Sequence, residues 1–217
     1  MENSLLEIKP QLLPNLGYLE TRLPPAILKF LDNAIKNKKK KKYNPNLAGN
    51  IGSSYLIPDK NNWFFNNVLQ KFIPLYNNSF GEGVAAQQTL TKDCRYVLKT
   101  MWVNYQQKHQ FNPLHDHAGV FSFVIWLKIP FSVEEEKNVP FAKHSHNPSA
   151  SCFEFSYCNS VGRIRNKLFS LSPESEGIML FFPSLLMHQV YPFYTSNGDR
   201  ISISGNISYD PEQIVKR

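Results

Sequence analysis

The apolar positions in the first third of the chain recur at helical spacing. From Pro24 to Lys36 they fall at every third or fourth residue behind two prolines, as at the start of an amphipathic helix. From Asn61 to Tyr76 the apolar face is largely aromatic, which is typical of a helix packed on a core. Residues 43–58, between them, are rich in Asn, Gly, Ser and Pro and predict a loop.

After Cys94 the pattern changes to short apolar and β-branched runs separated by Pro, Asn and Gly, which predict strands. The predicted strands cover residues 95–106, 120–129, 151–157, 167–171, 177–182, 188–193 and 200–209. Polar stretches at 134–138 and 143–150 predict loops. Such strands behind two helices predict a mainly β (α+β) fold, a β-sandwich or jelly-roll barrel with helices on one outer face.

The length of 217 residues suits one structural domain. Within it we expect residues 1–93 to form a helical and loop extension that buttresses the barrel, and residues 94–217 to form the jelly-roll core. No apolar run approaches the roughly 20 residues of a membrane span, and the N-terminus lacks the pattern of a secretion signal. The three cysteines have no metal-binding spacing and predict free thiols in a reducing, cytoplasmic setting.

The formal net charge of +7 admits an acidic partner, and nucleic acid is one such class. However, five consecutive lysines, Lys38 to Lys42, carry much of the excess. A lysine run after a helix is typical of a solvated linker, because like charges repel one another and stay hydrated. The charge is therefore weak support for a nucleic-acid partner.

The most informative residues are the histidines of the stretch Phe111 to Gly119. His115 and His117 are two positions apart, so on a strand both imidazoles share one face, with Asp116 on the other. His188 lies in a distant predicted strand. Three imidazoles that converge can bind Fe(II), Zn(II) or Cu and leave coordination positions open. The alternative is that His115 and His117 are exposed loop residues.

Arg200 and Ser202 follow His188 and share a strand face. A guanidinium binds a carboxylate through two parallel charge-assisted bonds, and a hydroxyl adds a third. Tyr105, ten positions before His115, can add a phenolic donor to the same anion. The alternative for Arg200 is an ordinary salt bridge to Asp199 or to a loop glutamate. The remaining histidines lie in polar stretches and are expected at the surface: His109, His144 and His146.

In order and spacing these motifs resemble the iron(II)- and 2-oxoglutarate-dependent dioxygenases, especially the prolyl-4-hydroxylase-like branch and its small bacterial and phage members. The resemblance covers residues 95–210. The family pattern is a tyrosine, about ten residues, His-x-Asp/Glu, a distal histidine and an Arg-x-Ser-like pair. The matching positions here are Tyr105, His115, His117, His188, Arg200 and Ser202. The stretch Phe182-Pro183-Ser184, just before the distal histidine, also looks like the family.

The resemblance implies a double-stranded β-helix with N-terminal helices packed on one face. It implies that His115, His117 and His188 hold Fe(II), and that Arg200 binds 2-oxoglutarate with help from Ser202 and Tyr105. It further implies O2-dependent hydroxylation with release of succinate and CO2, in the cytoplasm of a bacterial or phage-infected cell. The substrate it suggests is a protein or peptide side chain, although a nucleotide or another small molecule stays open.

One residue departs from the family pattern. The second metal ligand is normally a carboxylate, and His117 stands at that position. Strand alternation points the neighbouring Asp116 away from His115. A three-histidine dioxygenase of the cupin type, which does not use 2-oxoglutarate, is therefore the enzymatic alternative. The second alternative is a non-catalytic jelly-roll module for binding or structure.

Overall fold

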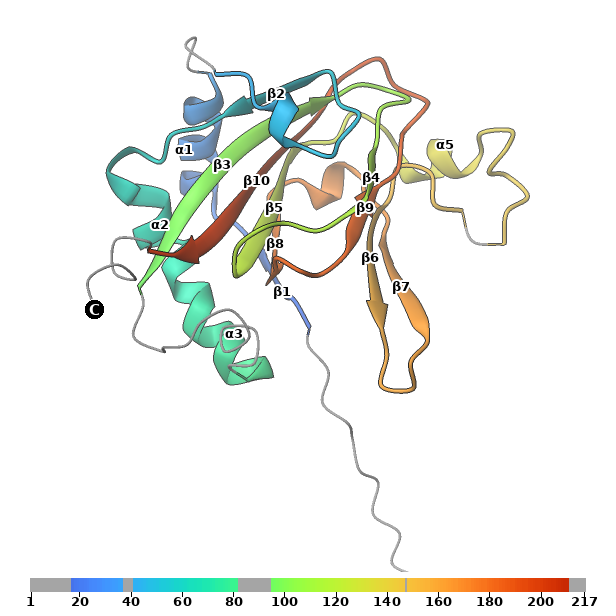
Figure 1. Ribbon diagram of the computed structural model, residues 1–217. Helices are drawn as coiled ribbons and strands as arrows, with labels where there is room; N and C mark the ends of the chain where they lie inside the picture. The colour runs from blue at the N-terminus through green and yellow to red at the C-terminus, as the bar shows by residue number, and fades with distance from the viewer. Residues whose placement is uncertain (1–16, 37–40, 82–94, 147, 211–217) are drawn as a thin grey trace, which may run out of the picture.

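The computed structural model describes residues 17–36, 41–81, 95–146 and 148–210 (Figure 1). Its strands are β1 (Leu19–Arg22), β2 (Ser53–Leu56), β3 (Tyr96–Gln106), β4 (Asn112–His115), β5 (Phe121–Lys128), β6 (Phe153–Cys158), β7 (Ile164–Phe169), β8 (Ile178–Pro183), β9 (His188–Val190) and β10 (Arg200–Tyr209). Its helices are α1 (Pro25–Ile35), α2 (Trp63–Asn67), α3 (Phe72–Phe80) and α5 (Val133–Lys137). Short 3-10 turns are η1 (Asn44–Asn46), η2 (Lys60–Asn62), η3 (Leu69–Lys71) and η4 (Pro173–Ser175).

The strands form two antiparallel sheets that face each other. The larger sheet has the order β1-β8-β5-β10-β3-β2, and the smaller has the order β4-β9-β6-β7. Apart from the β6–β7 hairpin, neighbours in each sheet come from distant parts of the chain, which is the winding of a double-stranded β-helix. The predicted fold class is confirmed. No helix in the described residues is both long and apolar enough to cross a membrane.

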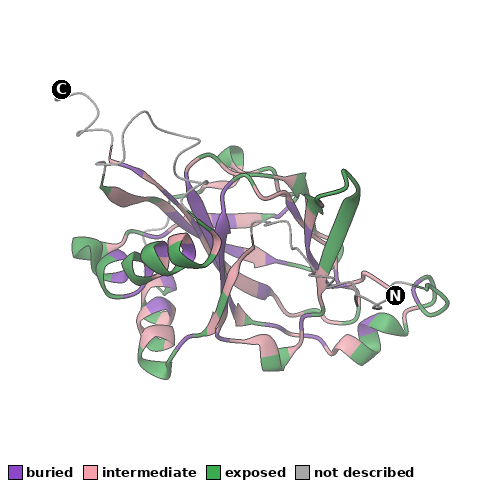
Figure 2. Ribbon diagram, turned by 90° about the horizontal axis from the view of Figure 1, so that it is seen from below, coloured by how far each residue is buried: buried purple, intermediate pink, exposed green. Residues whose placement is uncertain are grey.

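Two hydrophobic clusters stabilise this architecture. The first lies between the larger sheet and the helices α1, α2 and α3, where Leu31, Phe64 and Tyr76 meet Phe121 and Phe181. The second lies between the two sheets and includes Trp126, Phe153 and Phe182. The central strand β5 contributes to both clusters and is buried on both faces along most of its length (Figure 2). The helices therefore pack on the outer face of the larger sheet and do not fill the space between the two sheets.

The second predicted helix is interrupted in the structure. Asn61 and Asn62 adopt left-handed backbone angles, and helix α2 begins directly after them. Both oxygens of the Asp59 carboxylate accept from the first free backbone N–H groups of α2, those of Phe64 and Phe65. A further turn, η3, separates α2 from α3. The aromatic face still packs on the core as predicted.

Three short strands were absent from the sequence-based prediction: β1, β2 and β4. Each has four residues, and β2 lies inside the stretch predicted as a loop. The predicted loop at 134–138 contains a short helix, α5, because Glu136 is fully buried and accepts bonds from Tyr194 and Thr195. The proposed boundary between residues 93 and 94, Cys94, and Lys38 to Lys40 lie outside the described residues. Lys41 and Lys42 are exposed, as expected of a solvated run.

Candidate metal centre and anion pocket

Strand pairing brings the three predicted histidines together. The smaller sheet pairs β4 with β9 so that His115 lies directly opposite His188. His117 follows two residues after β4, and its backbone N–H donates to the carbonyl of Ser184, just beyond β8. One ligand nitrogen from each imidazole lies within 4.8 Å of the other two. The three form the one group of three or more potential ligands found among the described residues.

Backbone carbonyls orient two of these rings. The Nδ1 of His115 lies 2.7 Å from the carbonyl oxygen of Pro113, and the Nδ1 of His188 lies 2.8 Å from that of Leu186. A carbonyl can only accept, so each Nδ1 carries the proton and each Nε2 keeps its lone pair. The Nε2 atoms of His117 and His188 are 3.1 Å apart, a separation that a shared proton or a shared cation can bridge. This is the arrangement of metal-ligating histidines.

Burial keeps the cluster neutral. Desolvation lowers the pKa of His115, although the Pro113 carbonyl and Asp116 act in the opposite direction. Desolvation, together with repulsion from His115, lowers the pKa of His117 to about 4. The pKa of His188 lies well below its ordinary value for the same reasons. Neutral imidazole is the form that binds a metal ion, so the site favours a cation over protons.

The lowered pKa of His117 predicts an acid-sensitive metal-free protein. Its folded pKa of about 4 lies below the ordinary 6.5, so between these values the unfolded chain binds more protons. This contribution to stability is complete above pH 6.5 and is lost as the pH falls to 4, by about 3 kcal/mol in total. Urea unfolding across this range should show a smaller pH dependence in His117→Gln. An unchanged slope would contradict the neutral assignment, and exposed His109→Gln is the control.

No carboxylate joins the histidines in the described residues. Asp116 is exposed, as strand alternation predicted. The donor set is therefore three neutral nitrogens, which suits a divalent transition metal and leaves the remaining coordination positions to other ligands. The three histidines therefore fit Fe(II). His117 stands at the position where the family pattern has a carboxylate ligand.

A pocket runs from the histidines into the space between the sheets. Its polar side is formed by the inward faces of β3 and β10, and its apolar side by aromatic residues of β5, β6 and β8. The loop before β2 closes one wall. The residues that line it, besides the three histidines, include Gly49, Trp102, Asn104, Gln106, Asn112, Phe123, Trp126, Phe153, Phe182, Arg200, Ser202 and Ser204. Metal ligands and the predicted anion-binding pair thus share one pocket.

Arg200 is buried in this pocket without a carboxylate partner. Its side chain is 2% exposed. The guanidinium donates to the side-chain oxygen of Gln106 and to the backbone carbonyls of Ser151 and Tyr191, at 2.7–3.2 Å. Desolvation lowers the pKa of Arg200 to about 9, an effect that electrostatic interactions with Cys152 and Glu136 oppose. The predicted alternative, a salt bridge from Arg200 to Asp199 or a loop glutamate, is not formed by the described residues.

Ser202 lines the pocket beside Arg200, but Tyr105 does not. On β3 the pocket face carries Trp102, Asn104 and Gln106, so strand alternation places Tyr105 on the opposite face. There it packs with the first hydrophobic cluster, and its ring lies 6.1 Å from that of Tyr55. The structure therefore contradicts the expected contact between Tyr105 and the anion. Trp102 and Tyr105 are three positions apart on the same strand, so alternation places their side chains on opposite faces. This spacing was the signal in the sequence that could have shown it.

Two buried polar atoms in the pocket wall lack a hydrogen-bond partner, the indole nitrogen of Trp102 and the side-chain oxygen of Asn112. Trp102 is 2% exposed, and its ring lies 5.6 Å from that of His117. Buried donors and acceptors are rarely left unpaired. Their position fits a pocket that takes a polar occupant.

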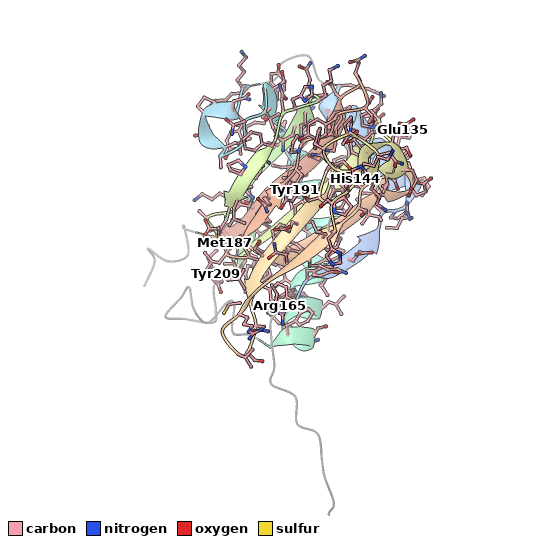
Figure 3. All side chains as sticks on the ribbon, turned by 90° about the vertical axis from the view of Figure 1, so that its right-hand side faces the viewer. Glu135, His144, Arg165, Met187, Tyr191 and Tyr209 are labelled. Carbon is pink, nitrogen blue, oxygen red and sulfur yellow. The ribbon has the colours of Figure 1, made fainter. Side chains whose placement is uncertain are left out.

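The other predicted surface residues lie where expected. His109, His144 and His146 are exposed, and Figure 3 places His144 near α5. Cys152 and Cys158 are free, the first buried and the second exposed. These residues take no part in the pocket.

Known proteins resemble the chain in both sequence and fold. Residues 100–206 match the family model described as "Putative 2OG-Fe(II) oxygenase". A 2OG-Fe(II) oxygenase family oxidoreductase from Burkholderia pseudomallei has a TM-score of 0.53 at 14% identity, with 88% of this chain and 84% of that chain covered. A Pseudomonas putida prolyl-4-hydroxylase gives 0.48 at 14% identity, with 88% and 91% covered. No curated protein sequence matches. Residues 100–206, just under half of the chain, thus match the iron(II)- and 2-oxoglutarate-dependent oxygenases, a family whose cofactors are Fe(II), 2-oxoglutarate and O2.

Proposed function

We propose that the protein is an iron(II)- and 2-oxoglutarate-dependent dioxygenase that hydroxylates a protein or peptide side chain and releases succinate and CO2. The observation that carries the proposal is the pairing, in one pocket, of three neutral imidazoles with a buried Arg200 that has no carboxylate partner. A buried guanidinium that no carboxylate of the described residues contacts carries a desolvation cost. A carboxylate ligand would remove that cost.

The chain's own residues divide the work between two ends of the pocket. His115, His117 and His188 would hold Fe(II) through their Nε2 atoms, while the carbonyls of Pro113 and Leu186 keep two of the rings in the ligating tautomer. When bound, Fe(II) with 2-oxoglutarate supplies the oxidising chemistry of the family. The protein binds, orients and protects these groups.

Arg200 and Ser202 would bind the distal carboxylate of 2-oxoglutarate. At present Gln106 accepts two bonds from the guanidinium, from Nε and from Nη2. A carboxylate can accept the same two donors in the bidentate geometry that arginine favours. The Gln106 side chain therefore occupies the position that the distal carboxylate of 2-oxoglutarate would take. Binding of 2-oxoglutarate would replace this neutral acceptor of Arg200 by an anionic one.

The aromatic wall would exclude water from the reacting centre. Phe153 and Phe182 lie against the ring of His188, at 5.7 and 5.2 Å between ring centroids. Trp126 packs on Phe153 from the larger sheet. A dry wall strengthens the electrostatic interactions of the pocket and limits side reactions. These aromatic residues are also core, so the wall is rigid.

The second candidate is a three-histidine dioxygenase that needs no 2-oxoglutarate. It is favoured by one observation, the absence of a carboxylate beside the histidines of the described chain. The two candidates differ in Arg200, which has a ligand to bind only in the first.

The proposed function predicts turnover of 2-oxoglutarate even without the native substrate. Uncoupled succinate formation should depend on Fe(II) and O2, because the pocket binds both metal and cosubstrate. Anaerobic addition of 2-oxoglutarate to the iron-loaded protein should also produce a visible metal-to-ligand charge-transfer band. Exposed His146→Ala is a matched control that should leave both signals unchanged. Iron uptake without band or succinate would favour the three-histidine candidate, and no iron uptake would exclude both.

A further inference from the structure

Strand β7 is an exposed edge of the sheet that carries the metal histidines. In the order β4-β9-β6-β7 it pairs, among the residues that the structure describes, on one side only, with β6. Its first four residues, Ile164 to Lys167, are exposed (Figure 2). The β6–β7 hairpin extends from the barrel (Figure 1), and Arg165 lies at the end of the molecule away from α5 (Figure 3). An exposed edge is a template for a further strand.

The hairpin's hydrogen bonds show which backbone groups of β7 face outward. The N–H of Asn159 donates to the carbonyl of Arg163 across the turn. Bonded and non-bonded pairs alternate in an antiparallel ladder, so Ile164, Asn166 and Leu168 direct N–H and C=O away from β6. Consistently, Ser156, the partner of Asn166, directs its N–H to Met187 on the other side. Within the described part of the chain, these three residues thus offer an unpaired ladder edge.

The side chains of β7 separate by charge onto two faces. Arg165 and Lys167 lie opposite Tyr157 and Phe155, on the face that continues the barrel interior. Ile164 and Leu168 lie on the other face. No ion pair in the described residues involves Arg165 or Lys167. The edge therefore presents cations toward one face and, apart from Asn166, which donates to Glu154, apolar side chains toward the other.

Charged residues on an edge strand can also serve to prevent aggregation. That explanation accounts for Arg165 and Lys167, but it does not account for the apolar residues beside them. Ile164 is 79% exposed and Val161, in the hairpin turn, is 73% exposed. Large apolar side chains at an unpaired edge favour association. The combination indicates a surface that selects a strand of suitable charge.

We propose that β7 pairs antiparallel with an extended acidic segment of a partner polypeptide. Directly opposed residues share a face, so the segment would alternate carboxylates near Arg165 and Lys167 with apolar residues near Ile164 and Leu168. Phe155 pairs with both Lys167 and His188, so the docked strand would lie in the sheet of the metal ligand. At about 4.8 Å per strand it would lie about 14 Å from β9.

The experiment is an anisotropy titration of the full-length protein with a fluorescein-labelled peptide of about ten residues in which glutamate and valine alternate. Wild type should bind it. Arg165→Glu with Lys167→Glu should weaken binding at least about tenfold and should instead bind the lysine–valine peptide. Lys60→Glu with Lys71→Glu, exposed residues on η2 and η3, makes the same charge change elsewhere and should leave affinity within about twofold.

N-methylated peptides test the strand pairing itself. In the antiparallel arrangement the valine N–H groups face β7 and the glutamate N–H groups face solvent. Methylation of the valine nitrogens should therefore abolish binding, whereas methylation of the glutamate nitrogens should not. Equal binding of both peptides, or preferential binding of an oligonucleotide, would overturn the proposal. It would show instead a cationic surface patch that binds anions without strand pairing. Because the readout is binding and not turnover, it is independent of the proposed oxygenase activity.

Discussion

Replacement of His188 by alanine is expected to lower the affinity for Fe(II) at least about 100-fold, which corresponds to about 2.7 kcal/mol. His188 is 4% exposed, and its Nε2 faces that of His117. Its loss leaves two nitrogens that cannot enclose an ion on their own. Anaerobic titration with Fe(II), followed by the iron content of the gel-filtered protein, measures the effect.

The same variant separates metal binding from folding. His188 is buried neutral, and its pKa is lowered chiefly by desolvation, so alanine removes one bond to the Leu186 carbonyl and no charge. We therefore expect the metal-free variant to remain folded, as judged by urea unfolding. Exposed His144→Ala is the matched control and should bind iron as wild type does. Iron affinity unchanged in His188→Ala would rule out the metal centre.

The parts of the fold that sequence predicted are those set by long, regular patterns. The seven predicted strands and α1 carry clear apolar periods, and an observed element overlaps each of them, although β9 has only three residues. Strands β1, β2 and β4 have only four residues each, too few for a period to emerge. Their existence depends on partners far along the chain, as β4 depends on β9.

The three histidines were predictable from the sequence, because a spacing of two on a strand fixes the face that a side chain occupies and because the order of the motifs matches the family pattern. The spacing of two placed His115 and His117 on one side, whereas the β4–β9 pairing that brings His188 to them is seen only in the structure. Tyr105 failed because its distance along the sequence says nothing about which face of β3 it occupies. Gln106 could not be foreseen either, since its role depends on the side chain of Arg200, 94 residues away.

Replacement of Arg200 by lysine is expected to raise the Kd for 2-oxoglutarate at least about 100-fold while leaving iron binding intact. Lysine keeps the positive charge but cannot make the bidentate contact. It also avoids the worst structural loss, because alanine would leave Gln106 and two backbone carbonyls without their donor. The charge-transfer band, titrated with 2-oxoglutarate in the anaerobic iron-loaded protein, gives the affinity directly.

Two neighbours sharpen this prediction because they lie on opposite faces of the larger sheet. Ser202 lines the pocket, so Ser202→Ala should weaken 2-oxoglutarate binding by up to about tenfold, the contribution of one neutral hydrogen bond. Tyr105 packs against Tyr55 on the helix side, so Tyr105→Phe should leave the affinity unchanged. A loss in Tyr105→Phe as large as that in Ser202→Ala would show that the anion lies elsewhere. An unchanged affinity in Arg200→Lys would do the same and would leave the three-histidine chemistry as the better account of this pocket.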